Sequence, residues 1–208
     1  MDVEQSYNIW ASQYDTNQNK TRDLEAVALR ETLSGFQFNN CLEIGCGTGK
    51  NTEWLLGIAE HVTAIDISEE MLLKAKSKIQ SQRVIFLQAD ITREWLFANK
   101  KYDLVTFSLV LEHIENLDEI LRKVAIVVKP RAYIYIGELH PFKQYSGTKA
   151  RFDTSEGQQI VQCYDHHISN FTQAAKIHGF ALVDLNEYFD ESNRTLTPRI
   201  LTLLLRKI

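Results

Sequence analysis

The chain has 208 residues, and its 44% hydrophobic and 24% charged residues are proportions typical of one globular domain with a full core. Its 23 Lys and Arg against 27 Asp and Glu give a net charge of −4, which argues against a broad nucleic-acid interface because such a surface is basic. The apolar runs are too short to span a bilayer, and the polar N-terminus does not resemble a signal peptide. We therefore expect a soluble, cytoplasmic protein without nucleic-acid or membrane partners.

Taken in chain order, the first expected element is a helix with aromatic side chains at Tyr7, Trp10 and Tyr14, spaced i, i+3, i+7. A second helix covers 22–33 and stops at Gly35. Strands and helices then alternate, which predicts a doubly wound parallel sheet. The expected strands are 41–44, 62–65, 84–87, 102–107, 132–136, 180–188 and 195–205, and the expected helices are 50–58, 69–79, 117–128 and 169–178. The last two strands have no helix between them, so we expect a hairpin with one antiparallel strand.

The cysteines and histidines form no metal motif in the sequence. Cys41, Cys46 and Cys163 are odd in number and lack C-x-x-C spacing, which favours reduced, buried thiols. His166 and His167 are adjacent, and adjacent side chains on one element rarely converge on one ion. We therefore expect no metal site.

The most informative segment is 41–49, in which an apolar strand leads into glycines at 45, 47 and 49. Glycine tolerates positive φ and lets a ligand approach the main chain, and a helix N-terminus follows directly. The spacing is G-x-G-x-G, with Lys50 where the dinucleotide fingerprint G-x-G-x-x-G has its third glycine. The G-x-x-x-x-G-K-[ST] pattern of a P-loop does not occur in the sequence. The segment therefore predicts a cofactor cradle of a different kind.

Together with Glu43, which stands two residues before the first glycine, the segment reads E-x-G-x-G-x-G and resembles motif I of the class I S-adenosylmethionine-dependent methyltransferases. The resemblance covers nearly the whole chain and is strongest to the small, single-domain, ubiquinone/menaquinone-biosynthesis-like branch. It implies an α/β, Rossmann-like, doubly wound sheet of seven strands in the order 3-2-1-4-5-7-6, with an antiparallel last hairpin strand and helices on both faces. It also implies S-adenosyl-L-methionine as cofactor, S-adenosyl-L-homocysteine as product and a small-molecule methyl acceptor.

A parallel sheet binds its ligand at the carboxyl ends of its strands, where the strand order reverses. Asp66 ends the second strand 21 residues after Gly45, the range in which an acidic side chain takes ribose hydroxyls, with a helix cap as the alternative. The resemblance places Ile67 and Met71 against the adenine and Asp90 at the adenine amino group. The expected cofactor-binding residues are Tyr14, Glu43, Gly45, Gly47, Gly49, Asp66, Ile67, Met71, Asp90, Ile91 and Ser108.

The resemblance implies a catalytic role for His113, which follows the fourth strand. A base there takes a proton from an acceptor hydroxyl, amine or acidic carbon, and histidine is suited to this task at neutral pH. Two alternatives stay open. The histidine bonds the backbone at a helix start, or alignment of the reactants supplies the catalysis without a base.

We expect a single domain, 1–208, with a helical cap at 1–35 and a lid-like insertion at 138–165, which is too long for an ordinary connection. The resemblance places both segments over the acceptor. The lid residues expected to meet the acceptor are His140, Tyr145, Arg151 and Tyr164. Aromatic and basic side chains of this kind indicate an acceptor with a planar or apolar part and an anionic group.

Other functions of the same fold stay open as alternatives. The motif also suits a non-catalytic protein that binds the cofactor or a modified form of it. The glycine spacing disfavours a dehydrogenase, and the intact glycines and Asp66 disfavour a purely structural subunit. No Asn/Asp-Pro-Pro-Tyr motif follows the fourth strand, which argues against methylation of base or glutamine nitrogens. A monomer and a homodimer both fit, and the acceptor is not specified.

Overall fold

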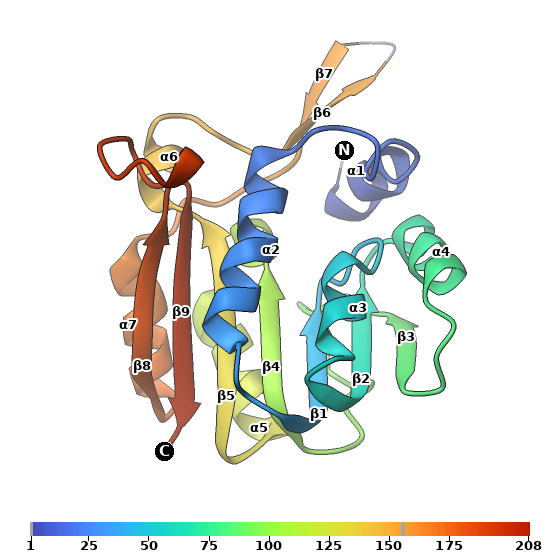
Figure 1. Cartoon of the computed structure of the whole chain (residues 1–208), viewed down its shortest axis with the longest axis vertical. Coiled ribbons are helices and arrows are strands. Elements are labelled where there is room, and N and C mark those ends of the chain that lie inside the picture. Colours follow the sequence, from blue (N-terminus) through green and yellow to red (C-terminus); the bar gives the residue numbers. More distant parts are fainter. Residues whose placement is uncertain (1, 155–156) are drawn as a thin grey trace.

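The computed structural model describes residues 2–154 and 157–208, and it contains a seven-stranded sheet between two layers of helices (Figure 1). The sheet order is β3-β2-β1-β4-β5-β9-β8. The strands of this sheet are β1 (Phe38–Ile44), β2 (Ala59–Asp66), β3 (Val84–Gln88), β4 (Tyr102–Ser108), β5 (Val128–Leu139), β8 (Phe180–Tyr188) and β9 (Ile200–Lys207). The neighbours from β3 to β5 pair in parallel, and β9 is antiparallel to both β5 and β8. The predicted α/β class with a mainly parallel sheet is confirmed.

The strand numbering differs from the expected order 3-2-1-4-5-7-6. Two further short strands, β6 (Arg151–Thr154) and β7 (Gly157–Ile160), follow β5 in the chain and pair only with each other. Both strands lie within the segment expected to form the lid-like insertion. The insertion 138–165 also contains the short helix α6 (Pro141–Tyr145), and its residues 155 and 156, like residue 1 of the expected cap, lie outside the described residues.

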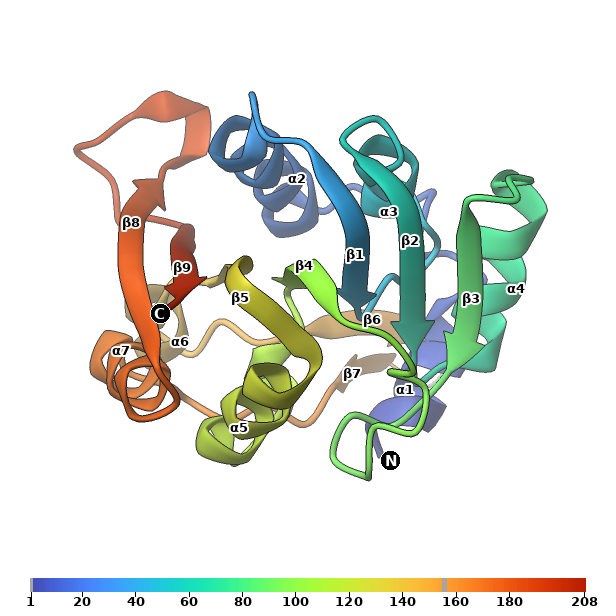
Figure 2. The ribbon, with the colours of Figure 1, turned by 90° about the horizontal axis from the view of Figure 1, so that it is seen from below.

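Helices cover both faces of the sheet, as Figure 2 shows from below. One face carries α2 (Lys20–Leu33), α3 (Lys50–Leu55) and α4 (Glu69–Lys78), and the other carries α5 (Leu117–Val127) and α7 (Ile168–Ile177). The helices begin where the sequence offers side-chain caps: Asn19 accepts backbone N–H bonds at the start of α2, Ser68 at α4 and Asn116 at α5. In the residues that the structure describes, no helix is long and apolar enough to cross a membrane.

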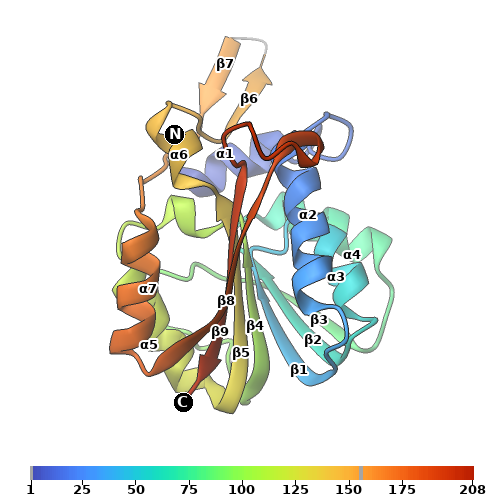
Figure 3. The same ribbon diagram turned by 60° about the vertical axis from the view of Figure 1, so that its left-hand side comes forward.

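The remaining elements gather at the carboxyl end of the sheet, where α1 (Val3–Trp10) and the β6–β7 hairpin lie above the strands (Figure 3). They share a small core of their own, because Trp10 of α1 stacks on Phe152 of β6 with ring centroids 5.3 Å apart, and Val161 is buried beside them. Helix α1 ends at Trp10, so Tyr14 lies in the turns that follow rather than in the expected helix. Two segments far apart in sequence thus cover the sheet edge together.

Candidate active site

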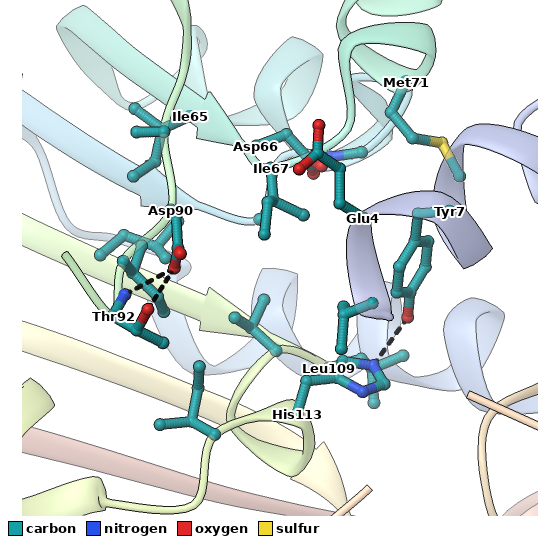
Figure 4. A pocket seen from close by; sticks show the side chains of 18 of the residues that line it. Glu4, Tyr7, Ile65, Asp66, Ile67, Met71, Asp90, Thr92, Leu109 and His113 are labelled. Carbon is teal, nitrogen blue, oxygen red and sulfur yellow. Dashed lines mark hydrogen bonds between the residues drawn. The ribbon is translucent and has the colours of Figure 1, made fainter. Parts of the chain in front are cut away.

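A cavity of about 420 Å³, the first cavity, opens at the carboxyl ends of β1, β2, β3 and β4 (Figure 4). The strand order reverses here, between β1 and β4, which is where open α/β sheets bind their ligands. Helix α1 lies over the opening and contributes Val3, Glu4 and Tyr7 to the wall. The volume is in the range of small-molecule sites.

Most of the expected cofactor-binding residues meet at the first cavity. Its lining includes Tyr14, Gly45, Gly47, Asp66, Ile67, Met71, Asp90, Ile91 and Ser108, together with His113. Glu43 and Gly49 lie behind the glycine loop instead. Glu43 is buried and accepts a hydrogen bond from Thr52 Oγ1 of α3. Gly49 packs against α4, where a Cβ would lie 2.8 Å from Ile79 Cδ1. These two residues therefore hold the loop and α3 in place.

The glycine loop needs residues without side chains for two separate reasons. Gly45 has a φ of +73°, and a Cβ there would lie 2.2 Å from Val110 Cγ2, a distance that no packing tolerates. Gly47 has a φ of +52°, and its N–H donates to Asp66 Oδ2 at 2.7 Å. The first glycine lets the loop after β4 pass closely, and the second aims a backbone N–H at the carboxylate that ends β2.

Asp66 occupies the centre of the cavity wall and is held from two sides. Its Oδ2 accepts the N–H of Gly47, and its Oδ1 accepts the N–H of Ser68 at 2.9 Å. Burial raises the pKa of this carboxyl, and the backbone hydrogen bonds oppose the rise. Each carboxylate oxygen has a second lone pair, so both oxygens keep the capacity to accept a hydroxyl. The helix-cap alternative and a ligand role are therefore compatible.

The far side of the cavity combines an acid with apolar side chains. Asp90 Oδ1 accepts hydrogen bonds from the backbone N–H and the hydroxyl of Thr92, at 2.8 and 2.7 Å. Ile67, Met71 and Ile91 supply apolar surface to the same cavity, and Ile67 lies between Asp66 and Asp90 (Figure 4). An apolar wall with an acceptor at each end suits a flat, polar-edged ligand.

His113 is fixed at both ring nitrogens. Its Nδ1 lies 2.7 Å from the carbonyl oxygen of Gln162, and its Nε2 lies 2.8 Å from the hydroxyl of Tyr7 (Figure 4). A carbonyl only accepts, so Nδ1 carries the proton, and in the neutral ring Nε2 accepts the Tyr7 O–H. Burial raises the pKa of Tyr7 well above its ordinary value, which keeps this hydroxyl protonated. A proton taken up by the Tyr7 oxygen can therefore be passed on, as the Tyr7 proton moves to Nε2 of His113.

Sequence reasoning missed Tyr7 as a site residue and read it only as part of an aromatic stripe. It also missed Leu109, which lines the cavity with a φ of +58°, a conformation that costs energy outside glycine and often marks a functional loop. The buried Glu138 at the end of β5 supports this loop, since its carboxylate accepts the N–H groups of Val110 and Leu111 at 3.0 and 2.8 Å. A left-handed leucine and a buried glutamate leave no local signal in the sequence.

The N-terminal segment is tied to the first cavity by polar contacts. Asp15 accepts a hydrogen bond from Thr48 Oγ1 in the glycine loop at 2.7 Å and pairs with Lys78 of α4 at 2.5 Å. Asn8 Oδ1 accepts the hydroxyl of Ser68 at 2.7 Å. These contacts hold α1 and the following turns across the opening.

The four expected lid residues are distributed differently from the cofactor set. His140 is buried, caps α6 and contacts Glu187 at 3.0 Å. Tyr145 is exposed and bonds His167 at 2.6 Å, and the Tyr164 hydroxyl accepts from a side-chain amide at 2.6 Å. Arg151 alone lines a neighbouring space, a second cavity of about 310 Å³.

Metal-ligating side chains do not cluster in the part of the chain that the structure describes. No group of three or more His, Cys, Asp or Glu is placed to hold an ion there. His166, one of the two adjacent histidines, is buried with its Nε2 at 2.7 Å from the carbonyl oxygen of Ile114. It therefore holds the loop after β4 to the lid segment.

Comparison with known proteins agrees with this geometry. Residues 42–136 match a family described as a methyltransferase domain. An uncharacterized methyltransferase of Emericella nidulans is 26% identical over 96% of this chain and 83% of its own length. A demethylmenaquinone methyltransferase of Leptospira interrogans is 32% identical over 49% of this chain and 44% of its own. The chain thus spans most of the first relative but only about half the length of many others, including the malonyl-[acyl-carrier protein] O-methyltransferases.

Solved structures show the same fold. A putative S-adenosylmethionine-dependent methyltransferase from Listeria monocytogenes has a TM-score of 0.77 and 24% identity, covering 89% of this chain and 99% of that one. Structures of this fold also include complexes with S-adenosylhomocysteine. The chain therefore has the fold of known S-adenosylmethionine-dependent methyltransferases, and its residues 42–136 match a methyltransferase domain family.

Proposed function

We propose that this chain transfers a methyl group from S-adenosyl-L-methionine to a small-molecule acceptor, as one domain, 1–208, with the cap at 1–35 and the lid at 138–165 over the reacting groups. The observation that carries the proposal is the Asp66 carboxylate, held by the Gly47 N–H at the switch point of the sheet. A cofactor with a ribose and an adenine needs an acceptor for the ribose hydroxyls next to an apolar surface for the adenine, and the first cavity offers both.

The residues of the first cavity fit this cofactor. Gly45 and Gly47 leave the loop without side chains, Asp66 offers two oxygens to the ribose, and Ile67 and Met71 offer an apolar face to the adenine. When bound, the cofactor supplies an electrophilic methyl group on a sulfonium. Glu43 supports the loop from behind in this proposal, because it is buried against Thr52 rather than at the cavity surface.

We assign the acceptor's proton to the Tyr7–His113 pair. Tyr7 lines both cavities, and its hydroxyl already donates to Nε2 of His113 at 2.8 Å. As the acceptor loses its proton to the Tyr7 oxygen, the Tyr7 proton moves to Nε2, and the Gln162 carbonyl stabilises the imidazolium through Nδ1–H. His113 is then the base and Tyr7 the group that touches the acceptor.

Calorimetry with S-adenosyl-L-methionine tests the cofactor site. We expect Asp66→Ala to weaken binding at least tenfold, because the ribose hydroxyls lose a charged acceptor, and a charge-assisted hydrogen bond contributes roughly 1.5–3 kcal/mol. The control is Glu60→Ala, which removes an exposed acid from the opposite end of the same strand. Unchanged affinity in Asp66→Ala contradicts the ribose assignment.

A transfer assay tests the activity itself. The protein is incubated with methyl-labelled S-adenosyl-L-methionine and a small-molecule extract, and mass spectrometry identifies which compound gains the label. We expect a labelled small molecule with the unmodified chain and much less of it with Asp66→Ala when the cofactor concentration is below saturation. Cofactor binding without any labelled product across extracts would favour the non-catalytic alternative.

A further inference from the structure

The second cavity lies directly beside the first and is separated from it by three shared residues. Tyr7, Tyr14 and Leu109 line both spaces. The second cavity has a volume of about 310 Å³, and it is bounded by the turns after α1, the start of α2 and the segment that leads into β6. A molecule in this space therefore lies beside Tyr7, which also lines the first cavity.

The two cavities are lined by groups of opposite charge. Among the described lining residues, the first cavity has the carboxylates of Asp2, Glu4, Asp66 and Asp90 and the cation of Arg93. The second cavity has the cations of Lys20, Lys149, Arg151 and Arg199 and the carboxyl group of Glu112. The acidic lining suits a cofactor that carries a sulfonium and an ammonium. By the same reasoning, the basic lining suits a molecule that carries negative charge.

The cations of the second cavity differ in how they are held. Arg199 is fixed in place, with Nε and Nη2 at 2.5 and 2.6 Å from the carboxylate of Asp190. Within the described residues, Lys20, Lys149 and Arg151 lie in no ion pair with a carboxylate. In the described part of the chain, these three cations of the lining therefore have no carboxylate within ion-pair distance.

The opposing acid and the aromatic side chains refine the class of ligand. Glu112 is only 6% exposed, and burial raises the pKa of its carboxyl, which favours the neutral, proton-donating form. Trp10 joins Tyr7 and Tyr14 in the lining and gives the space an aromatic side. The cavity thus combines a cationic end with an aromatic surface.

We infer that the second cavity is the acceptor site and that the acceptor is a small molecule with an anionic group, carboxylate or phosphate, bound by Lys149 and Arg151 next to an apolar or planar part. This inference rests on the proposed methyl transfer and adds the class of its acceptor. The anionic group lies at the cationic lining, and the rest of the molecule lies against the aromatic side chains near Tyr7.

Three probes of similar shape test the inference: benzoate, phenyl phosphate and the neutral benzamide. Each is titrated by calorimetry into the protein saturated with S-adenosyl-L-homocysteine at low ionic strength. We expect at least one anion to bind ten times more tightly than benzamide, and which anion does so distinguishes a carboxylate from a phosphate. Equal binding of all three, or no binding by either anion, overturns the inference.

Matched variants locate the binding to this cavity. We expect Lys149→Gln with Arg151→Gln to remove the preference for the anion while the affinity for S-adenosyl-L-homocysteine stays within twofold, since neither residue lines the first cavity. Arg30→Gln with Lys176→Gln makes the same charge change on exposed residues outside both cavities. If both pairs reduce anion binding equally, the effect is one of net charge and the inference fails. If the unmodified chain does not bind S-adenosyl-L-homocysteine, the result instead contradicts the proposed cofactor site.

Discussion

At the scale of single residues, the site depends on contacts between side chains that the sequence separates widely. The Tyr7 hydroxyl and His113 Nε2 meet across 106 positions of the chain. Because Nε2 of His113 already accepts the Tyr7 hydroxyl proton in a hydrogen bond, the histidine cannot bond the acceptor directly through that nitrogen. A base that acts through a tyrosine hydroxyl allows the histidine to stay away from the acceptor and still receive its proton.

The relay predicts equal effects for its two members. We expect His113→Ala and Tyr7→Phe each to lower kcat by about 10²-fold or more, the contribution typical of general-base catalysis, with little change in the cofactor Kd. Tyr145→Phe is the matched control, because Tyr145 makes a similar hydrogen bond to His167 at 2.6 Å but lines neither cavity. An unaltered kcat in both variants would leave alignment of the reactants as the whole mechanism.

Part of the site could be predicted at this scale, and part could not. Asp66 and Asp90 were predicted because each directly follows an apolar strand, and the ends of parallel strands meet at one edge. Tyr7 and Leu109 were not, because their placement depends on tertiary packing and on one unusual backbone angle. Arg151 was expected to contact the acceptor and lines the second cavity, whereas His140, Tyr145 and Tyr164 line neither. Their expected acceptor contacts would need the lid to rearrange.

At the scale of elements, the strands were predicted better than the segments that cover them. Apolar runs marked all seven strands of the sheet, although β9 begins at Ile200 rather than 195. The β6–β7 hairpin was missed because only Phe152 in it is buried and its other side chains show no alternation of apolar and polar residues. Its stability comes from Trp10 of α1, a contact that local pattern does not reveal.

Asp15, in the turns after α1, contacts Thr48 of the glycine loop and Lys78 of α4. These contacts predict that a bound ligand leaves the first cavity more slowly than it would without them. We expect Asp15→Ala to increase the dissociation rate of S-adenosyl-L-homocysteine by about three- to tenfold, because it removes the contacts to Thr48 and Lys78 that hold the N-terminal turns over the cavity. Stopped-flow fluorescence measures this rate. Asp23→Ala is the control, since it breaks a comparable exposed ion pair with Lys50 at 2.6 Å. Equal rates in the two variants would show that the Asp15 contacts have no part in retention.

At the scale of the whole molecule, several carboxyl groups are buried under the sheet edge. Burial raises the pKa of Glu25 to about 7 and those of Glu43 and Glu138 to about 8. Since an unfolded Glu titrates near ~4.3, the folded chain binds more protons than the unfolded chain between these values. The stability that these groups contribute is complete below about pH 4 and is lost as the pH rises from there to about 8.

This linkage predicts a melting temperature that falls between pH 5 and pH 8. The carboxyls with lowered pKa, such as Asp15 and Asp190, contribute no slope there, because they are ionised in both states. We expect Glu43→Gln to make the fall smaller, because it removes one of the three groups and keeps a partner for Thr52. Calorimetry at constant ionic strength measures the effect. A melting temperature that rises across this range would contradict the burial of these carboxyls.

The fold class was set by the alternation of strands and helices, and the site by the glycine loop within it. Both depend on the pattern of residues within short segments, so both could be predicted from the sequence without knowledge of the tertiary contacts. The charge difference between the two cavities is a property of the assembled molecule, since Lys20, Arg151 and Arg199 come from distant parts of the chain.

The most direct test of the account is a crystal structure of the protein soaked with S-adenosyl-L-homocysteine. We predict that the ribose hydroxyls lie within hydrogen-bond distance of Asp66, with the adenine between Ile67 and Met71. The rest of the ligand lies over Gly45 and Gly47. Electron density for the ligand at any other place, with the first cavity left empty, would contradict the central claim.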